Sequence, residues 1–201
     1  MKKIVLLLLL VSFSAFSQKV KKSTQKKSAT PASVSVSVSA SSSSADGFTV
    51  KNEGNAIYII SASNKTLIKK TENSNANITN LSIKSFTASG NKLYLISWAE
   101  KSLTKTALKE ELTTSTINQI WNLETNSMII ENTEFSTMIT EKVFLDKNKT
   151  VSETQQRVRR GGFGFELASN GDILLKNKSS QDYYSFDKDK QQYVFKSSVK
   201  K

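Results

Sequence analysis

The sequence contains no cysteine and no histidine, and only one proline and seven glycines among its 201 residues. Without cysteine, no disulfide holds the chain together, and cysteine-based zinc and iron–sulfur sites are excluded. Without histidine, a Ser-His-Asp triad, a Cys-His dyad and a histidine metal ligand are excluded as well. Carboxylates remain as the candidate catalytic groups, and we expect neither a cofactor nor a bound metal.

The N-terminus has the pattern of a secretory signal peptide. Lys2 and Lys3 precede an apolar run from Ile4 to Val11, and Ala15 and Ser17 have the small-x-small spacing that signal peptidase accepts. The apolar run is shorter than the roughly 20 residues that a membrane-spanning helix needs. The sequence therefore predicts a signal peptide over residues 1–17. It also predicts export to the periplasm or the outside of the cell, and no transmembrane segment after cleavage.

The residues around the cleavage point carry a resemblance. A signal that ends in Phe16-Ser17-Gln18, followed by a chain rich in lysine, asparagine, serine and threonine, resembles secreted proteins of flavobacteria. The resemblance covers the signal and the composition, and it includes no functional motif. It implies export and says nothing about a ligand.

Residues 18–46 form a basic, serine-rich segment. It contains five lysines between residues 19 and 27 and a Ser-Val alternation from Ser33 to Ser39. Because it has little apolar bulk to offset the entropy of ordering, we expect a flexible linker. The Ser-Val alternation also has the period of a strand, so pairing with an exposed sheet edge is the alternative.

The net charge of +12 bears on the partner class. A basic linker favours attraction to anionic surfaces such as acidic polysaccharide or phospholipid head groups. Export argues against nucleic acid. We therefore expect an anionic glycan or an envelope protein as the partner, and no nucleic acid.

From residue 47 to 201, short runs of β-branched and aromatic residues alternate with turn signals. Ile57–Ile60, Leu93–Trp98 and Ile120–Leu123 are examples, and Asn170-Gly171 has the residues of a type I′ turn. The pattern predicts an all-β domain, an antiparallel meander of about 10–12 strands in a rolled sheet, a sandwich or an open barrel.

Residues 99–112 permit two interpretations. Leu103, Ala107, Leu108 and Leu112 would form one face of a short helix. The neighbouring threonines favour a strand through their branched β-carbons. We expect a long hairpin here, with one short helix as the alternative.

All three arginines of the chain fall within one segment, followed by two glycines. Forked guanidinium groups beside phenylalanines suit the recognition of phosphate, sulfate or carboxylate. Arg157, Arg159 and Arg160 are therefore the candidate ligand-binding residues. Strand alternation places Arg157 and Arg159 on one face, where we expect them to form the ligand-binding pair, and Arg160 on the other face with Val158, which we expect to face inward. The alternatives are a solvated basic strand before a Gly161-Gly162 hairpin turn, and a proteolytic processing site.

Carboxylates supply the alternative function. Two carboxylates about 5–10 Å apart suffice for glycoside hydrolysis. Candidates are Glu131, Glu134, Glu141, the pair Glu110-Glu111, and Asp187 with Asp189. Lysines lie close to most of them, and no aromatic and amide cluster typical of a sugar cleft flanks them. We therefore expect a non-enzymatic exported domain for binding or structure, with a glycan, peptide or envelope protein as partner. A small carboxylate-based glycan hydrolase is the alternative.

Overall fold

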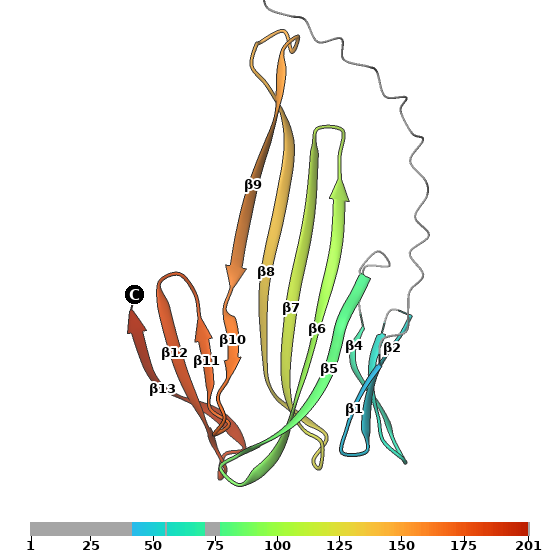
Figure 1. The fold of residues 1–201 in the computed structure, drawn as a ribbon, viewed down its shortest axis with the longest axis vertical. Coiled ribbons are helices and arrows are strands. Elements are labelled where there is room, and N and C mark those ends of the chain that lie inside the picture. The colour runs from blue at the N-terminus through green and yellow to red at the C-terminus, as the bar shows by residue number, and fades with distance from the viewer. Residues whose placement is uncertain (1–41, 55, 71–76, 201) are drawn as a thin grey trace, which may run out of the picture. The chain divides into compact units, whose positions relative to one another are not determined.

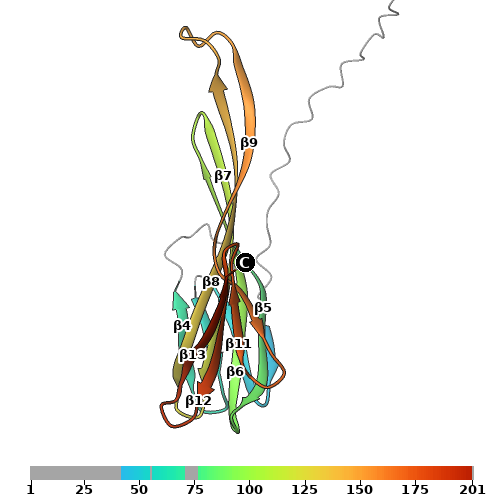
Figure 2. The ribbon, with the colours of Figure 1, turned by 90° about the vertical axis from the view of Figure 1, so that its left-hand side faces the viewer.

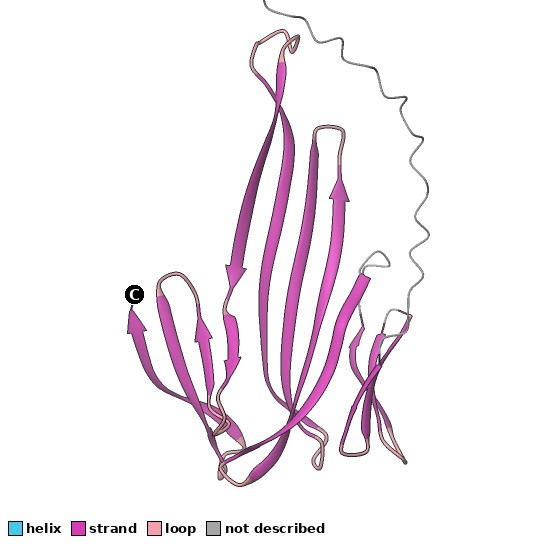
Figure 3. Ribbon diagram, viewed as in Figure 1, coloured by secondary structure: helices cyan, strands magenta, loops and turns pink. Residues whose placement is uncertain are grey.

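The computed structural model describes residues 42–54, 56–70 and 77–200. The chain divides into two units, Met1–Val36 and Ser37–Lys201, and the described residues all belong to the second. They form thirteen strands and no helix, so no helix in this part of the chain is fit to cross a membrane (Figure 3). The expected all-β fold is confirmed. The signal peptide and most of the expected linker lie outside the described residues.

The strands form three antiparallel sheets, in each of which strands adjacent in sequence are neighbours (Figure 1). The N-terminal sheet consists of β1 (Ser42–Ala45), β2 (Phe48–Glu53), β3 (Ala56–Ile60) and β4 (Lys65–Lys70). The central sheet consists of β5 (Asn77–Ala88), β6 (Asn91–Lys105), β7 (Lys109–Asn122), β8 (Ser127–Phe144) and β9 (Ser152–Gly162). The C-terminal sheet consists of β10 (Gly164–Leu167), β11 (Ile173–Lys176), β12 (Ser180–Asp187) and β13 (Gln192–Lys200).

The core lies on both faces of one half of the central sheet. Along β6, Tyr94, Ile96 and Trp98 join the core formed with Val50 and Ile57 of the N-terminal sheet. Alternation turns Leu93 and Leu95 to the opposite face, where they pack with residues of the C-terminal sheet such as Ile173 and Phe186. The result is three stacked sheets, which matches the sandwich among the expected architectures.

The long hairpin over residues 99–112 is confirmed. β6 and β7 pair continuously to the end of β6, with Leu103 opposite Leu112. The Thr106 side chain closes the turn, because its hydroxyl oxygen accepts a hydrogen bond of 3.1 Å from the Lys109 backbone N–H. The helical spacing of the leucines therefore reflects their cross-strand pairing.

The structure differs from the expected end of the linker and from one expected turn. Residues 42–45, assigned to the linker, form β1, because Asp46 and Gly47 both have positive φ angles (51° and 83°) and make a tight hairpin turn into β2. At Asn170-Gly171, only Gly171 has a positive φ, so the turn is not type I′. The connection there is longer and includes a hydrogen bond of 3.0 Å from the Gly171 N–H to the Ala168 carbonyl.

The other half of the central sheet extends past its neighbours. β5 begins at Asn77, opposite Lys101 of β6, and only β6 to β9 continue beyond that level. Figures 1 and 2 show these strands projecting beyond the other described strands. We call the part made of residues 101–115, 135–144 and 152–160 the distal ribbon, and the packed half of the central sheet the proximal half.

Candidate functional site

The structure separates the three arginines between the two faces of β9. Ile139 of β8 pairs with Arg157 on one side and with Glu111 of β7 on the other. Arg157 Nη2 lies 3.5 Å from Glu141 Oε2. The pKa of Glu111 is lowered, chiefly by a hydrogen bond from Lys109 and further by the charges of Arg159 and Arg157. Arg157 and Arg159 thus face carboxylates of their own sheet.

Arg160 and Val158 share the opposite face, but Val158 does not face inward. Its side chain is exposed, because no described strand packs over the distal ribbon at this level. The expected hairpin turn at Gly161-Gly162 was also wrong. Both glycines belong to β9, opposite Phe135 and Glu134. The chain then leaves the central sheet and enters the C-terminal sheet at Gly164.

This crossover is held tightly. Gly162 has a φ of +79°, and a Cβ there would overlap the Thr133 carbonyl oxygen, so only glycine fits. Asn132, which is buried, donates a hydrogen bond of 2.8 Å from its amide nitrogen to the Phe163 carbonyl. The crossover therefore has a fixed path from one sheet to the next.

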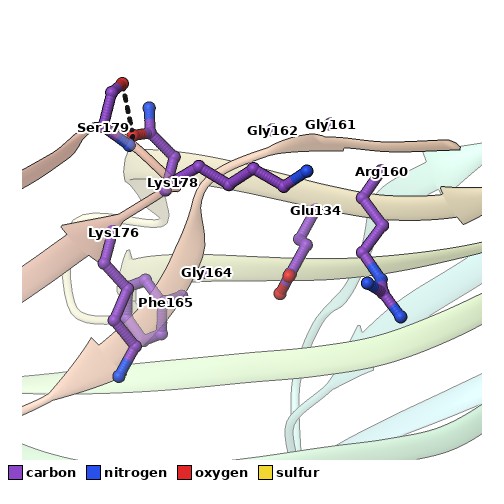
Figure 4. A pocket seen from close by; sticks show the side chains of 10 residues that line it. Glu134, Arg160, Gly161, Gly162, Gly164, Phe165, Lys176, Lys178 and Ser179 are labelled. Carbon is purple, nitrogen blue, oxygen red and sulfur yellow. Dashed lines mark hydrogen bonds between the residues drawn. The ribbon is translucent and has the colours of Figure 1, made fainter.

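A pocket of about 670 Å³ lies where the crossover meets the C-terminal sheet (Figure 4). It is lined by Glu134 of β8, Arg160, Gly161 and Gly162 of β9, Gly164 and Phe165 of β10, Lys176 of β11, and Asn177, Lys178 and Ser179 of the following loop. Three cationic residues, one on β9, one on β11 and one on the loop after β11, thus line the pocket together with one carboxylate and one aromatic ring.

The cations of the pocket differ in their partners. Arg160 and Lys178 form no ion pair with any residue that the structure describes. Lys176 Nζ lies 2.6 Å from Glu166 Oε2, and this hydrogen bond, followed by the charges of Glu166 and Glu134, raises the pKa of Lys176. Arg160 and Lys178 are therefore the cations that are available to a ligand.

The loop that carries Lys178 has a defined shape. The Asn177 side-chain oxygen accepts hydrogen bonds of 2.8 Å from the backbone N–H groups of Ser179 and Ser180. This is an Asx turn, which fixes the backbone on both sides of Lys178. Glu134 stands across the pocket from the loop, diagonal to Arg160 in the β8–β9 ladder.

The carboxyl groups are the other candidate functional groups of the chain. The carboxyl groups with a clear shift among the described residues all have a lowered pKa. They are Asp46, Glu53, Glu111, Asp146 and Asp187. A general acid at neutral pH needs the opposite shift. Among the residues described, no cluster of three or more acidic side chains is placed to hold a metal ion.

Sequence reasoning named Arg160, noted the phenylalanines beside the arginines, and listed Glu134 only as a candidate catalytic carboxylate. It missed Lys176 and Lys178, because only the packing of the C-terminal sheet brings them to Arg160. Comparisons of the chain with protein-family models, with curated proteins and with solved structures find no match.

Proposed function

We propose that the protein is an exported, non-enzymatic binding protein whose pocket holds the acidic group of an anionic glycan. The observation that carries this proposal is the pair of cations, Arg160 and Lys178, that line a concave site without an ion-pair partner among the described residues. The forked guanidinium group of Arg160 suits a bidentate contact with a carboxylate or sulfate, and Lys178 adds a point charge.

The rest of the lining fits a saccharide. The Phe165 ring offers an apolar surface, and the Glu134 carboxylate accepts hydrogen bonds from sugar hydroxyl groups. The glycine backbone of the crossover lets a ring approach closely. The predicted signal peptide and basic linker support this proposal, because they favour export to a compartment where acidic polysaccharides occur.

The test is a calorimetric titration of the mature chain with tetragalacturonate, with the neutral galactose tetramer as the control ligand. Arg160→Ala should weaken tetragalacturonate binding by about 10- to 100-fold, the range expected for a hydrogen-bonded charge pair. Arg157→Ala is the matched control, because it removes the same charge from the other face of the same strand. Binding should also weaken as the salt concentration rises.

A second variant changes the shape of the pocket and leaves its charges in place. A Cβ at Gly164 would lie 3.5 Å from Lys176 Cγ and 3.6 Å from Glu134 Oε2, which are ordinary contacts. Gly164→Ala should therefore weaken binding without lowering the melting temperature. Absence of tetragalacturonate binding, or equal losses in Arg157→Ala and Arg160→Ala, would overturn the proposal.

A further inference from the structure

One face of the distal ribbon carries a continuous row of exposed aliphatic side chains. Leu103 pairs with Leu112, Leu112 pairs with Met138, and Met138 pairs with Val158, so the row crosses all four strands. The four side chains, in that order, are 52%, 36%, 45% and 55% exposed. We call this row the apolar stripe. With strands about 4.8 Å apart, its three steps span about 14 Å.

On the opposite face of the distal ribbon, at the level of the apolar stripe, the aliphatic side chain is covered by its neighbours. There, Ile139 is 2% exposed, because it lies between the longer side chains of its cross-strand neighbours Glu111 and Arg157. Aliphatic side chains on that face are thus covered by the ribbon itself, whereas the apolar stripe has no cover among the described residues. A contiguous exposed apolar row bordered by polar rows is typical of a binding surface.

The apolar stripe adjoins the pocket. Val158 and Arg160 are two residues apart on the same face of β9, a separation of about 7 Å along a strand. The next row on this face pairs Ser136 with Arg160, which itself lines the pocket, so the stripe and the pocket are directly adjacent. A ligand with its acidic group at Arg160 therefore has an apolar surface beginning at Val158 and Met138.

From this continuity we infer that the ligand is an amphiphile, with an acidic sugar head in the pocket and an aliphatic chain along the apolar stripe. The inference rests on the proposed function and adds the ligand class. The charges of the pocket orient the head, and the stripe removes the chain from water. Because the stripe covers only one side of the chain, each added methylene should strengthen binding about twofold, less than for full burial.

The probes are methyl, hexyl and decyl β-glucuronide, with decyl β-glucoside as the uncharged control, all below their micelle-forming concentrations. The mature chain should bind decyl glucuronide at least tenfold more tightly than methyl glucuronide. The double variant Met138→Ser with Val158→Ser should lose this chain-length dependence and keep its affinity for methyl glucuronide. Leu67→Ser is the matched control, because Leu67 is 50% exposed on β4 and lies outside the stripe.

The outcomes separate the two proposals. Equal affinity for methyl and decyl glucuronide would overturn the amphiphile inference and leave the acidic-glycan pocket standing. Equal affinity for decyl glucoside and decyl glucuronide, with no effect of Arg160→Ala, would overturn the role of the pocket. Chain-length dependence that survives the double variant would place the aliphatic chain elsewhere and would also overturn the inference. Circular dichroism of each variant checks that the fold is retained.

Discussion

The proximal half and the distal ribbon of the central sheet are made by the same strands but stabilised by different forces. In β6, Leu93, Ile96 and Trp98 are almost fully buried between two other sheets, while Leu103, farther along the same strand, is about half exposed. The ladder of paired residues is continuous through both regions. The comparison shows that strand pairing alone extends a sheet, and that a second layer decides where it has a core.

The distal ribbon depends on its ladder, on cross-strand pairs and on surface ion pairs, each of which contributes little. Its edge strand, β9, is exposed along nearly all of its length. Arginines at positions 157, 159 and 160 keep this edge from pairing with another chain, because charged edge strands resist edge-to-edge association. Of these three arginines, only Arg160 also lines the proposed site.

The largest expected loss of folding stability comes from a substitution in the proximal half. Trp98 is 1% exposed and donates a hydrogen bond from its indole nitrogen to Glu100. Trp98→Ala should lower the free energy of unfolding by about 3–5 kcal/mol, through lost burial and a cavity. Urea denaturation measures this loss. Leu103→Ala, farther along β6, is the control and should cost well under half as much; equal costs would contradict the division into two regions.

The next largest loss of folding stability is expected from a substitution at the junction between the central and C-terminal sheets. Gly162→Ala places a Cβ in a left-handed conformation and against the Thr133 carbonyl. The strain should cost about 1–3 kcal/mol of stability, and more if the crossover cannot shift. Thermal denaturation followed by circular dichroism measures it. Gly164→Ala is the matched control two residues later, where the added methyl group has room; an unchanged Gly162→Ala melting temperature would mean that the crossover is loose.

A smaller effect is expected from the ion pair of the distal ribbon. Arg157→Ala removes an exposed contact with Glu141. Because solvent screens exposed pairs, the loss should be about 0–1 kcal/mol and should shrink further in high salt. Urea denaturation at two salt concentrations tests this, and a loss near that of Trp98→Ala would show that the ribbon has a core after all.

The smallest expected effect is a pH-dependent loss of local stability at the turn between β8 and β9. Hydrogen bonds to the Asp146 carboxylate, from the Thr150 hydroxyl and then from the Val151 and Thr150 backbone N–H groups, lower the pKa of Asp146 from 3.8 to about 2. Because the folded-state pKa is depressed, this stabilisation is present above about pH 4 and is lost as the pH falls towards 2.

Amide hydrogen exchange of Thr150 and Val151 between pH 4 and pH 2, corrected for the intrinsic rate, measures this effect. Protection at the β8–β9 turn should fall in that interval while the proximal half stays protected. In Asp146→Asn, which cannot ionise, the two amides should show no such pH dependence. A titration that persists in this variant would assign the change to another group.

Local signals in the sequence were sufficient for much of the fold. Alternating β-branched runs and their turns predicted the hairpins, and the threonines near Leu103 and Leu112 predicted the long β6–β7 hairpin, although the spacing of the leucines also allowed a helix. Asp46-Gly47 was missed because the serine-rich segment before it reads as a linker, although the dipeptide is itself a hairpin turn signal. The exposure of Val158 was missed because alternation assigns a face but not whether another layer covers it.

The candidate site was less accessible to sequence reasoning. Arg160 and Lys178 are separated by a crossover and a hairpin, and no spacing rule relates residues in two different sheets. Clustering singled out all three arginines, and strand alternation favoured Arg157 and Arg159 as the ligand-binding pair, whereas only Arg160 lines the pocket. Only the pairing of β9 with β8 turned Arg157 towards Glu141 and left Arg160 facing the pocket.

The strand order has a consequence for how the molecule forms. In every sheet the spatial order of the strands is their order along the chain, so each strand meets a neighbour that has just been made. Such local pairing keeps the contact order low for an all-β protein and favours rapid folding. If the chain is exported from its N-terminus, as the signal pattern predicts, it would complete one hairpin before the next emerges, and without cysteine it would need no disulfide exchange.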